Sequence, residues 1–202
     1  MLLERRSVLA NSAAFGETSV AMKSIGWARF SWEAKDLPET SRYIVAETYS
    51  LRSASRQEKS LVSQVIHSCF AQESCWNDVA SKLVPRLHQE VEEKFAHHRE
   101  SDCLVITHGN RVIAASIIDT SPSCDNHLLT GPCITVEYRN RGFGALLLKE
   151  SLLLAAQSGA EVLFGITRGN SPAARFVYPK YGGVSVPYEV DLGQSSMSHW
   201  VV

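Results

Sequence analysis

One short stretch of the chain combines arginine and glycine in a pattern that suits the binding of a phosphate-rich anion. Arg139 and Arg141 precede Gly142 and Gly144, and a leucine-rich run to Ala156 begins at the second glycine. Glycine permits positive φ and leaves room for the close approach of a ligand. A helix N-terminus carries about half a positive charge and several unpaired N–H groups. The stretch therefore predicts a pyrophosphate-binding turn at the start of a helix.

The turn is expected to connect a strand to this helix. Ile134 and Val136 flank a threonine, an alternation that is typical of a strand. In this setting Arg139-x-x-Gly142-x-Gly144 resembles the acyl-CoA-binding signature of the GNAT superfamily of N-acyltransferases, whose backbone N–H groups hold the CoA pyrophosphate. Many relatives have Pro three residues before the Arg, where this chain has Val136.

A second motif at residues 170–183 strengthens the resemblance. In the family's second signature Asn opens a helix, Ala follows three residues later, Tyr seven later and Gly eleven later. Counting back from Tyr178 puts Ser171 at the Asn position, and Asn170 lies one residue early, so either could serve. The family's usual Gly-Phe ending is Gly182-Gly183 in this chain.

The resemblance implies transfer of an acetyl group from acetyl-CoA to a primary amine, by direct attack on the thioester in a ternary complex. Tyr178 occupies the place of the family's usual general acid, and a phenol of pKa about 10 can donate to a thiolate of pKa near 8.5. Tyr181 becomes the candidate if the register slips. Glu137, at the end of the strand, is the candidate general base by position. The alternative interpretation of Tyr178 is a core tyrosine, and that of Glu137 is a solvated carboxylate in the turn.

The resemblance also implies which residues contact the acyl-CoA. Ile134 and Val136 offer their backbone to the pantetheine arm, because the two central strands splay apart there in the family. Asn170 or Ser171 also contacts this arm. The turn contributes backbone N–H groups, and its two arginines add charge-assisted hydrogen bonds unless they are ordinary surface cations. The expected binding residues of the turn are Arg139, Asn140, Arg141, Gly142, Phe143, Gly144 and Ala145.

Apolar periodicity predicts an α+β fold. Amphipathic helices are expected at 57–71 and 77–98, and Pro85 should divide or kink the second. Further strands are expected at 43–51, 103–107, 111–118, 184–190 and 197–202.

A strand–helix–strand unit completes this fold. It joins residues 132–136, 143–157 and 162–166, and predicts a parallel βαβ pair. With the resemblance, we expect a mixed, mostly antiparallel central sheet of about six to seven strands, flanked by helices. Residues 41–202 form the acetyltransferase-like domain in this interpretation. Residues 1–40 form an N-terminal extension of uncertain structure, in which an alternation around Phe30 hints at a short strand.

Composition narrows the class of protein. The chain has 202 residues, is 45% hydrophobic and has a formal net charge of −1, so no basic field favours nucleic acid. Five scattered cysteines form no CxxC pair, which predicts reduced thiols in a cytoplasmic protein. No apolar run of membrane-spanning length and no paired metal-ligand spacing occurs, so neither a membrane nor a metal is expected.

Two other functions compete with the acyltransferase hypothesis. A dinucleotide-binding oxidoreductase would have a third glycine where this chain has Leu147. A non-catalytic CoA-binding or protein-interaction module on the same fold stays open, because fold alone does not decide function. The acceptor, a small-molecule or peptide amine, carries no signature, and a longer acyl donor stays open. A homodimer is also open, since dimers are common on this fold.

Overall fold

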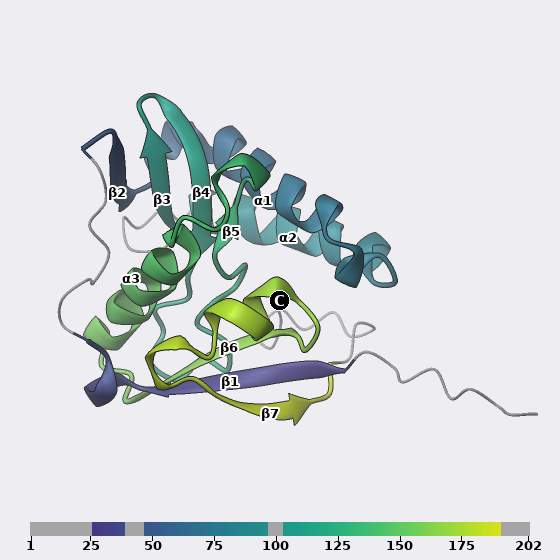
Figure 1. Cartoon of the computed structure of the whole chain (residues 1–202), viewed down its shortest axis with the longest axis vertical. Coiled ribbons are helices and arrows are strands. Elements are labelled where there is room, and N and C mark those ends of the chain that lie inside the picture. Colours follow the sequence, from purple (N-terminus) through teal and green to yellow (C-terminus); the bar gives the residue numbers. More distant parts are fainter. Residues whose placement is uncertain (1–25, 39–46, 97–102, 191–202) are drawn as a thin grey trace, which may run out of the picture.

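The computed structural model describes residues 26–38, 47–96 and 103–190. Within these ranges the chain forms two antiparallel sheets, one above the other in Figure 1. The larger sheet has the strand order β2-β3-β4-β5, and the smaller sheet has the order β6-β1-β7. The strands are β1 (Trp27–Glu33), β2 (Tyr49–Ser53), β3 (Cys103–His108), β4 (Arg111–Ile117), β5 (Cys133–Ile134), β6 (Val162–Arg168) and β7 (Val184–Tyr188).

Three α-helices accompany the sheets in the described ranges. They are α1 (Lys59–Gln72), α2 (Ala80–Ala96) and α3 (Phe143–Gln157). α2 continues through Pro85 as one helix, so of the two predicted effects of this proline, a division or a kink, the division does not occur. Short helical turns link the larger elements at Ala34–Asp36, Arg56–Glu58, Ser74–Trp76, Val136–Tyr138, Ala173–Val177 and Lys180–Gly182.

Both faces of the larger sheet are covered, which explains the continuous apolar run of β3. Every residue from Cys103 to Thr107 is buried. Leu104 and Ile106 belong to the apolar cluster that contains the leucines of α3, whereas Val105 packs with residues of α1 and α2. Successive side chains of a strand point to opposite faces, so a strand between two layers of helices needs apolar residues throughout.

The first described strand occupies the middle of the smaller sheet. Trp27 of β1 pairs with Arg168 of β6 and with Tyr188 of β7, and Trp32 is 1% exposed. The strand predicted around Phe30 is therefore an integral part of the fold. The structure places residues 27–37 inside the folded unit rather than in an extension that precedes it, and residues 1–25 lie outside the described ranges.

The predicted α+β class with mostly antiparallel pairing is confirmed, but the predicted parallel pair is absent from the described strands. β5 and β6 belong to different sheets. A loop occupies the edge of β6 instead, because His127 N–H donates to the carbonyl of Phe164 at 2.8 Å and Ile166 N–H donates to Asn126 Oδ1 at 3.2 Å. β5 ends after Ile134, where the chain enters a helical turn.

The remaining strand predictions fall partly outside the described residues. The strand predicted at 43–51 is observed as Tyr49–Ser53, and the residues from 43 to 46 are not described. The strand predicted at 197–202 is also outside. β7 is an edge strand in the described sheet, a position that tolerates Pro187 because proline has no N–H to donate.

Candidate active site

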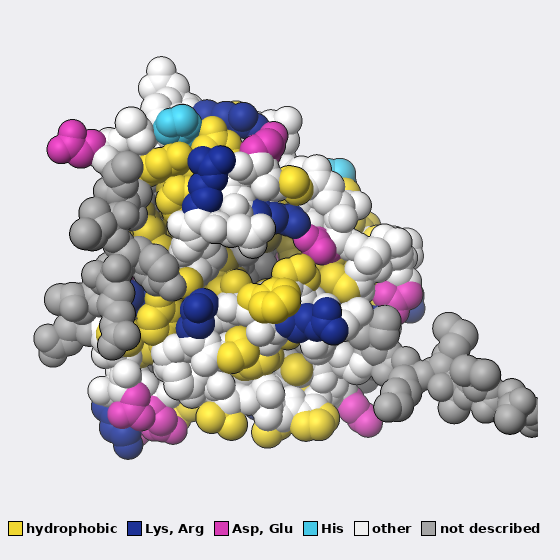
Figure 2. Space-filling model, in the orientation of Figure 1, with side chains coloured by type: hydrophobic (Ala, Val, Ile, Leu, Met, Phe, Trp, Pro, Cys, Tyr) yellow, Lys and Arg dark blue, Asp and Glu magenta, His cyan; other side chains and the backbone are white. Residues whose placement is uncertain are grey.

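A cavity of about 410 Å³ lies where the two sheets separate, within the size range of sites for small ligands. Its walls come from the end of α1, from β5 and the following turn, from the start of α3, and from the segment 171–180. Figure 2 shows hydrophobic, Lys and Arg side chains around a hollow between the two halves of the molecule. The predicted site residues that line it are Ile134, Arg139, Asn140, Gly142, Phe143, Gly144, Ala145, Ser171 and Tyr178.

The arginine–glycine turn is built around two residues with positive φ. Asn140 has φ 61° and Gly142 has φ 85°, so the chain reverses sharply before α3 starts at Phe143. The carbonyl of Gly142 accepts the N–H of Leu146 at 3.0 Å, which is the first bond of the helix. The N–H groups of the preceding helical residues have no intrahelical acceptor. Because these residues line the cavity, the predicted anion site faces it.

The two arginines of the turn have different surroundings. Arg139 lines the cavity, where its Nε donates to the carbonyl of Ile134 at 3.0 Å and its Nη1 pairs with the carboxylate of Glu73. Arg141 is absent from the described lining and donates to the carbonyl of Glu137 at 3.0 Å. Arg139 is thus the arginine of the turn that a ligand in the cavity can reach.

Tyr178 lines the cavity, and two buried aromatic rings pack behind it. Its ring meets Phe30 at 5.2 Å and Trp32 at 5.4 Å between centroids, both nearly edge to face. The hydroxyl has no hydrogen-bond partner among the described residues and lies beside Gly131, which also lines the cavity. An unpaired buried hydroxyl costs about 1–3 kcal/mol. Burial also raises the pKa of the Tyr178 phenol, which keeps it a proton donor.

Tyr181, the other candidate phenol, lies elsewhere. It is absent from the described lining, and its hydroxyl donates to the carbonyl of Ala145 at 3.1 Å. Of the two phenols, Tyr178 is therefore the one that lines the cavity. The Gly-Gly ending of the second motif also has a physical reason. A Cβ on Gly183 would lie 2.0 Å from the carbonyl oxygen of Tyr178 and 2.6 Å from Nε1 of Trp32.

The two candidates for the Asn position of the second motif are clearly separated. Ser171 is 1% exposed and lines the cavity. Its hydroxyl accepts the N–H of Ala174 at 3.1 Å and lies 3.0 Å from Oγ1 of Thr167. Asn170 is not part of the described lining. Ser171 therefore caps the short helical segment that carries Tyr178.

Glu137 and Val136 lie in another hollow, together with Leu61 and Arg111. Glu137 is 62% exposed and pairs with Arg111 at 3.4 Å. A hydrogen bond with its own backbone N–H and the neighbouring guanidinium of Arg111 lower the pKa of Glu137. The structure does not bring the predicted base or Val136 to the cavity of Tyr178, because the turn Val136–Tyr138 directs these side chains to the outer side of β5.

Sequence analysis missed several residues of the cavity, because they come from α1, some 60 residues before the turn. Cys69 donates its thiol to the carbonyl of Ile134 at 3.2 Å. A hydrogen bond from the thiol of Cys133, with Arg139 nearby, lowers the pKa of Cys69, and this bond together with burial raises the pKa of Cys133. Glu73 follows α1 directly. No local motif marks these residues, and only the packing of α1 on β5 brings them to the site.

Comparison with solved structures identifies the fold. A GCN5-related N-acetyltransferase from Sphaerobacter thermophilus matches with a TM-score of 0.56 and 10% identity, over 81% of this chain and 49% of that chain. The fold is that of the GCN5-related N-acetyltransferases. A glucosamine N-acetyltransferase region of a fungal multi-domain GH3 β-N-acetylglucosaminidase matches with a TM-score of 0.53 and 13% identity, over 80% of this chain and 20% of that chain.

A third structure with this fold, a functionally unknown protein from Staphylococcus epidermidis, matches with a TM-score of 0.52 and 15% identity, over 80% and 58% of the two chains. Each matched region thus spans little more than half of the solved chain, or less. No protein-family model and no curated protein sequence matches this chain.

The residues at 26–38, 47–96 and 103–190 contain no group of three or more His, Cys, Asp or Glu side chains that could hold a metal ion. None of the helices in those ranges combines the length and apolarity needed to cross a membrane.

Proposed function

We propose that this protein transfers an acetyl group from acetyl-CoA to a primary amine, by direct attack of the amine on the thioester. The observation that carries the proposal is the hydroxyl of Tyr178, which is buried and has no partner among the described residues. The same cavity contains the N-terminus of α3. An anion site and an unused proton donor therefore face one space, as a reaction with a CoA thioester requires.

In this proposal the turn and β5 bind the acetyl-CoA. The first N–H groups of α3 and the Arg139 side chain are suited to the CoA diphosphate. The backbone beside Ile134 is suited to the pantetheine arm, because β5 and β6 belong to separate sheets and leave room between them. Ser171 holds the helical segment of Tyr178 against that gap.

The chemical half falls to Tyr178. Attack of the amine nitrogen forms the C–N bond and breaks the C–S bond of the thioester. The phenol then gives its proton to the departing thiolate, and the amine gives up a proton to a base or water. General acid catalysis of this kind contributes about 10²- to 10⁴-fold to the rate.

Thermal melting with acetyl-CoA tests the proposal, with NADH as the control ligand. Acetyl-CoA at about one hundred times its dissociation constant should add about 2.7 kcal/mol to the free energy of unfolding. Gly142→Val should abolish most of this shift, because a β-branched residue strongly disfavours φ near 85°. A shift without release of CoA in the presence of any primary amine would favour a non-catalytic CoA-binding module. No shift at millimolar acetyl-CoA would contradict the proposal.

A further inference from the structure

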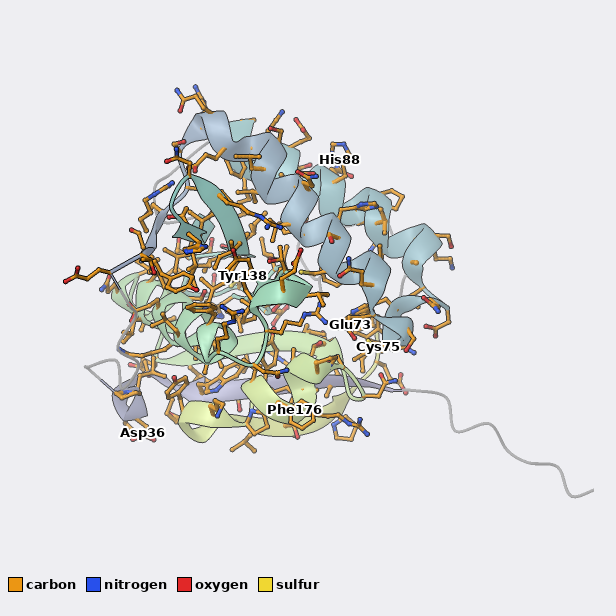
Figure 3. All side chains as sticks on the ribbon, turned by 45° about the horizontal axis from the view of Figure 1, so that its top comes forward. Asp36, Glu73, Cys75, His88, Tyr138 and Phe176 are labelled. Atoms are coloured by element: carbon orange, nitrogen blue, oxygen red, sulfur yellow. The ribbon has the colours of Figure 1, made fainter. Side chains whose placement is uncertain are left out.

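Glu73 is the single carboxylate among the described residues that line the cavity. It follows α1 directly and precedes the turn Ser74–Trp76, and its side chain is 22% exposed. Figure 3 shows it at the end of α1, with Tyr138 and Phe176 on other elements of the cavity wall. A cavity that receives an ammonium group and removes its proton needs a negatively charged base, and the carboxylate of Glu73 is the one that the described walls offer.

The carboxylate of Glu73 is engaged by Arg139, the cation that the turn presents to the cavity. The diphosphate of a CoA molecule would compete for this guanidinium, because phosphate and carboxylate bind its N–H groups in the same manner. The second contact of Arg139, from Nε to the carbonyl of Ile134 at 3.0 Å, does not involve Glu73 and can persist. An anion at the turn and the carboxylate of Glu73 are thus alternative partners of one guanidinium.

A carboxylate that loses its cation in a partly buried cavity gains by binding another cation. The walls beside Glu73 include Phe70 and Trp76, whose ring centroids lie 5.1 Å apart. These rings offer an apolar surface next to the acid. The chemistry of this corner suits a protonated primary amine with an apolar body.

We propose that Glu73 binds the ammonium of the acceptor and takes its proton, and that the CoA diphosphate frees Glu73 for this by drawing Arg139 away. The inference rests on the proposed acetyl transfer. The carboxylate of Glu73 takes one proton from the bound ammonium, which leaves the neutral amine that attacks the thioester. The nitrogen gives up its second proton to water as the C–N bond forms. Tyr178 gives one proton to the thiolate as the C–S bond breaks, and solvent returns both groups to their starting states.

The test is Glu73→Gln, which keeps the size of the side chain but removes its charge. Binding of coenzyme A, measured by calorimetry, should become about two- to fivefold tighter, the factor expected when a partly exposed ion pair no longer competes. Turnover of 2-phenylethylamine or butylamine with acetyl-CoA should fall about 10²- to 10⁴-fold. The loss should shrink as the pH rises toward the pKa of the amine, since less deprotonation is then needed.

Two further variants separate this role from a structural one. Glu73→Asp keeps the carboxylate and should recover part of the turnover. Glu92→Gln removes a carboxylate that pairs with Lys59 on the surface, and should change neither binding nor turnover. Weaker or unchanged binding of coenzyme A by Glu73→Gln, or unchanged turnover, would overturn the inference while the wild-type activity stands. A wild-type protein that binds no acetyl-CoA would overturn the proposed function as well.

Discussion

The cavity of Tyr178 and the second hollow, which contains Glu137 and is called the outer hollow below, lie on either side of the segment that follows β5. Each contains an Arg–Glu pair. In the cavity Arg139 meets Glu73, with the two side chains 30% and 22% exposed. In the outer hollow Arg111 meets Glu137 at 3.4 Å, with side chains 58% and 62% exposed. Water screens the outer pair strongly and the inner pair much less. The same two residue types therefore form a partly buried pair in one place, where we propose that it couples to a ligand, and an ordinary surface pair in the other.

The largest effect on turnover is expected from a substitution in the cavity. Tyr178→Phe should lower kcat about 10²- to 10⁴-fold while acetyl-CoA binding persists. Stability should not fall, because the hydroxyl has no protein partner to lose in the described ranges. Because burial raises the pKa of this phenol, the wild-type rate should not decline from phenol ionisation as the pH rises to 9.

Steady-state kinetics and melting curves check this prediction. Tyr181→Phe is the matched control, since Tyr181 is absent from the described lining and its phenol donates to the carbonyl of Ala145. It should cost about 1 kcal/mol of stability and leave turnover near the wild-type value. Full turnover by Tyr178→Phe would contradict the role of Tyr178 as the proton donor of the reaction.

The next largest effect is a loss of stability, expected from a substitution at Gly183 in the wall behind Tyr178. Gly183→Ala places a Cβ 2.0 Å from the Tyr178 carbonyl and against Trp32, so backbone must move. We expect a loss of about 1–3 kcal/mol in the free energy of unfolding, measured by urea denaturation. Gly26→Ala is the control, because nothing lies within 4 Å of its added Cβ. Equal stability of the two variants would contradict the packing described for this wall.

A third Arg–Glu pair gives a reference between the two extremes. Arg52 binds Glu58 through two bonds of 2.8 and 2.7 Å, and this contact lowers the pKa of Glu58 to about 2. The pair's contribution to stability should be complete above the unfolded pKa of about 4.3 and be lost as the pH falls toward 2. At neutral pH Glu58→Gln should cost no more than about 1 kcal/mol, because the pair is partly exposed.

Denaturation at pH 7 and at pH 3 measures that contribution. The difference between wild type and Glu58→Gln should be smaller at the lower pH, because the wild-type carboxyl then begins to bind protons. A difference that grows on acidification would have the wrong sign for a lowered pKa.

The smallest effect on stability and turnover is expected from a substitution in the outer hollow. Glu137→Gln removes a largely exposed carboxylate whose partner, Arg111, is also exposed. Melting temperature and turnover should both stay at their wild-type values. A marked loss of turnover would show that the outer hollow contributes to catalysis, and would reverse the comparison between the two sides.

Local patterns predicted what local geometry determines. The arginine–glycine turn, the start of α3 and the placement of Tyr178 follow from residues within a few positions of one another. Glu137 lies outside the cavity because β5 ends at Ile134 and the chain then forms the turn Val136–Tyr138. One helical turn is enough to move a side chain to the other face of the segment.

The parts that sequence analysis missed depend on distant contacts. Glu73 and Cys69 reach the cavity because α1 packs against β5. Trp32 explains why the second motif ends in Gly182-Gly183 rather than Gly-Phe, since a Cβ at position 183 would lie within 3.0 Å of its ring. The reason for this departure from the motif therefore lies some 150 positions earlier in the chain, where inspection of the motif alone does not reach.

The pairing of β1 with β6 and β7 also constrains how the protein is made. The partners of β1 follow it by about 130 residues or more along the chain. At the usual pace of translation the ribosome needs roughly ten seconds or more to deliver them. During that interval the nascent strand, with Phe30 and Trp32, has no sheet to join. The aromatic cluster behind Tyr178 therefore forms only after β6 and β7 have been synthesised, and a truncated chain that lacks these strands would leave the two rings without their sheet partners.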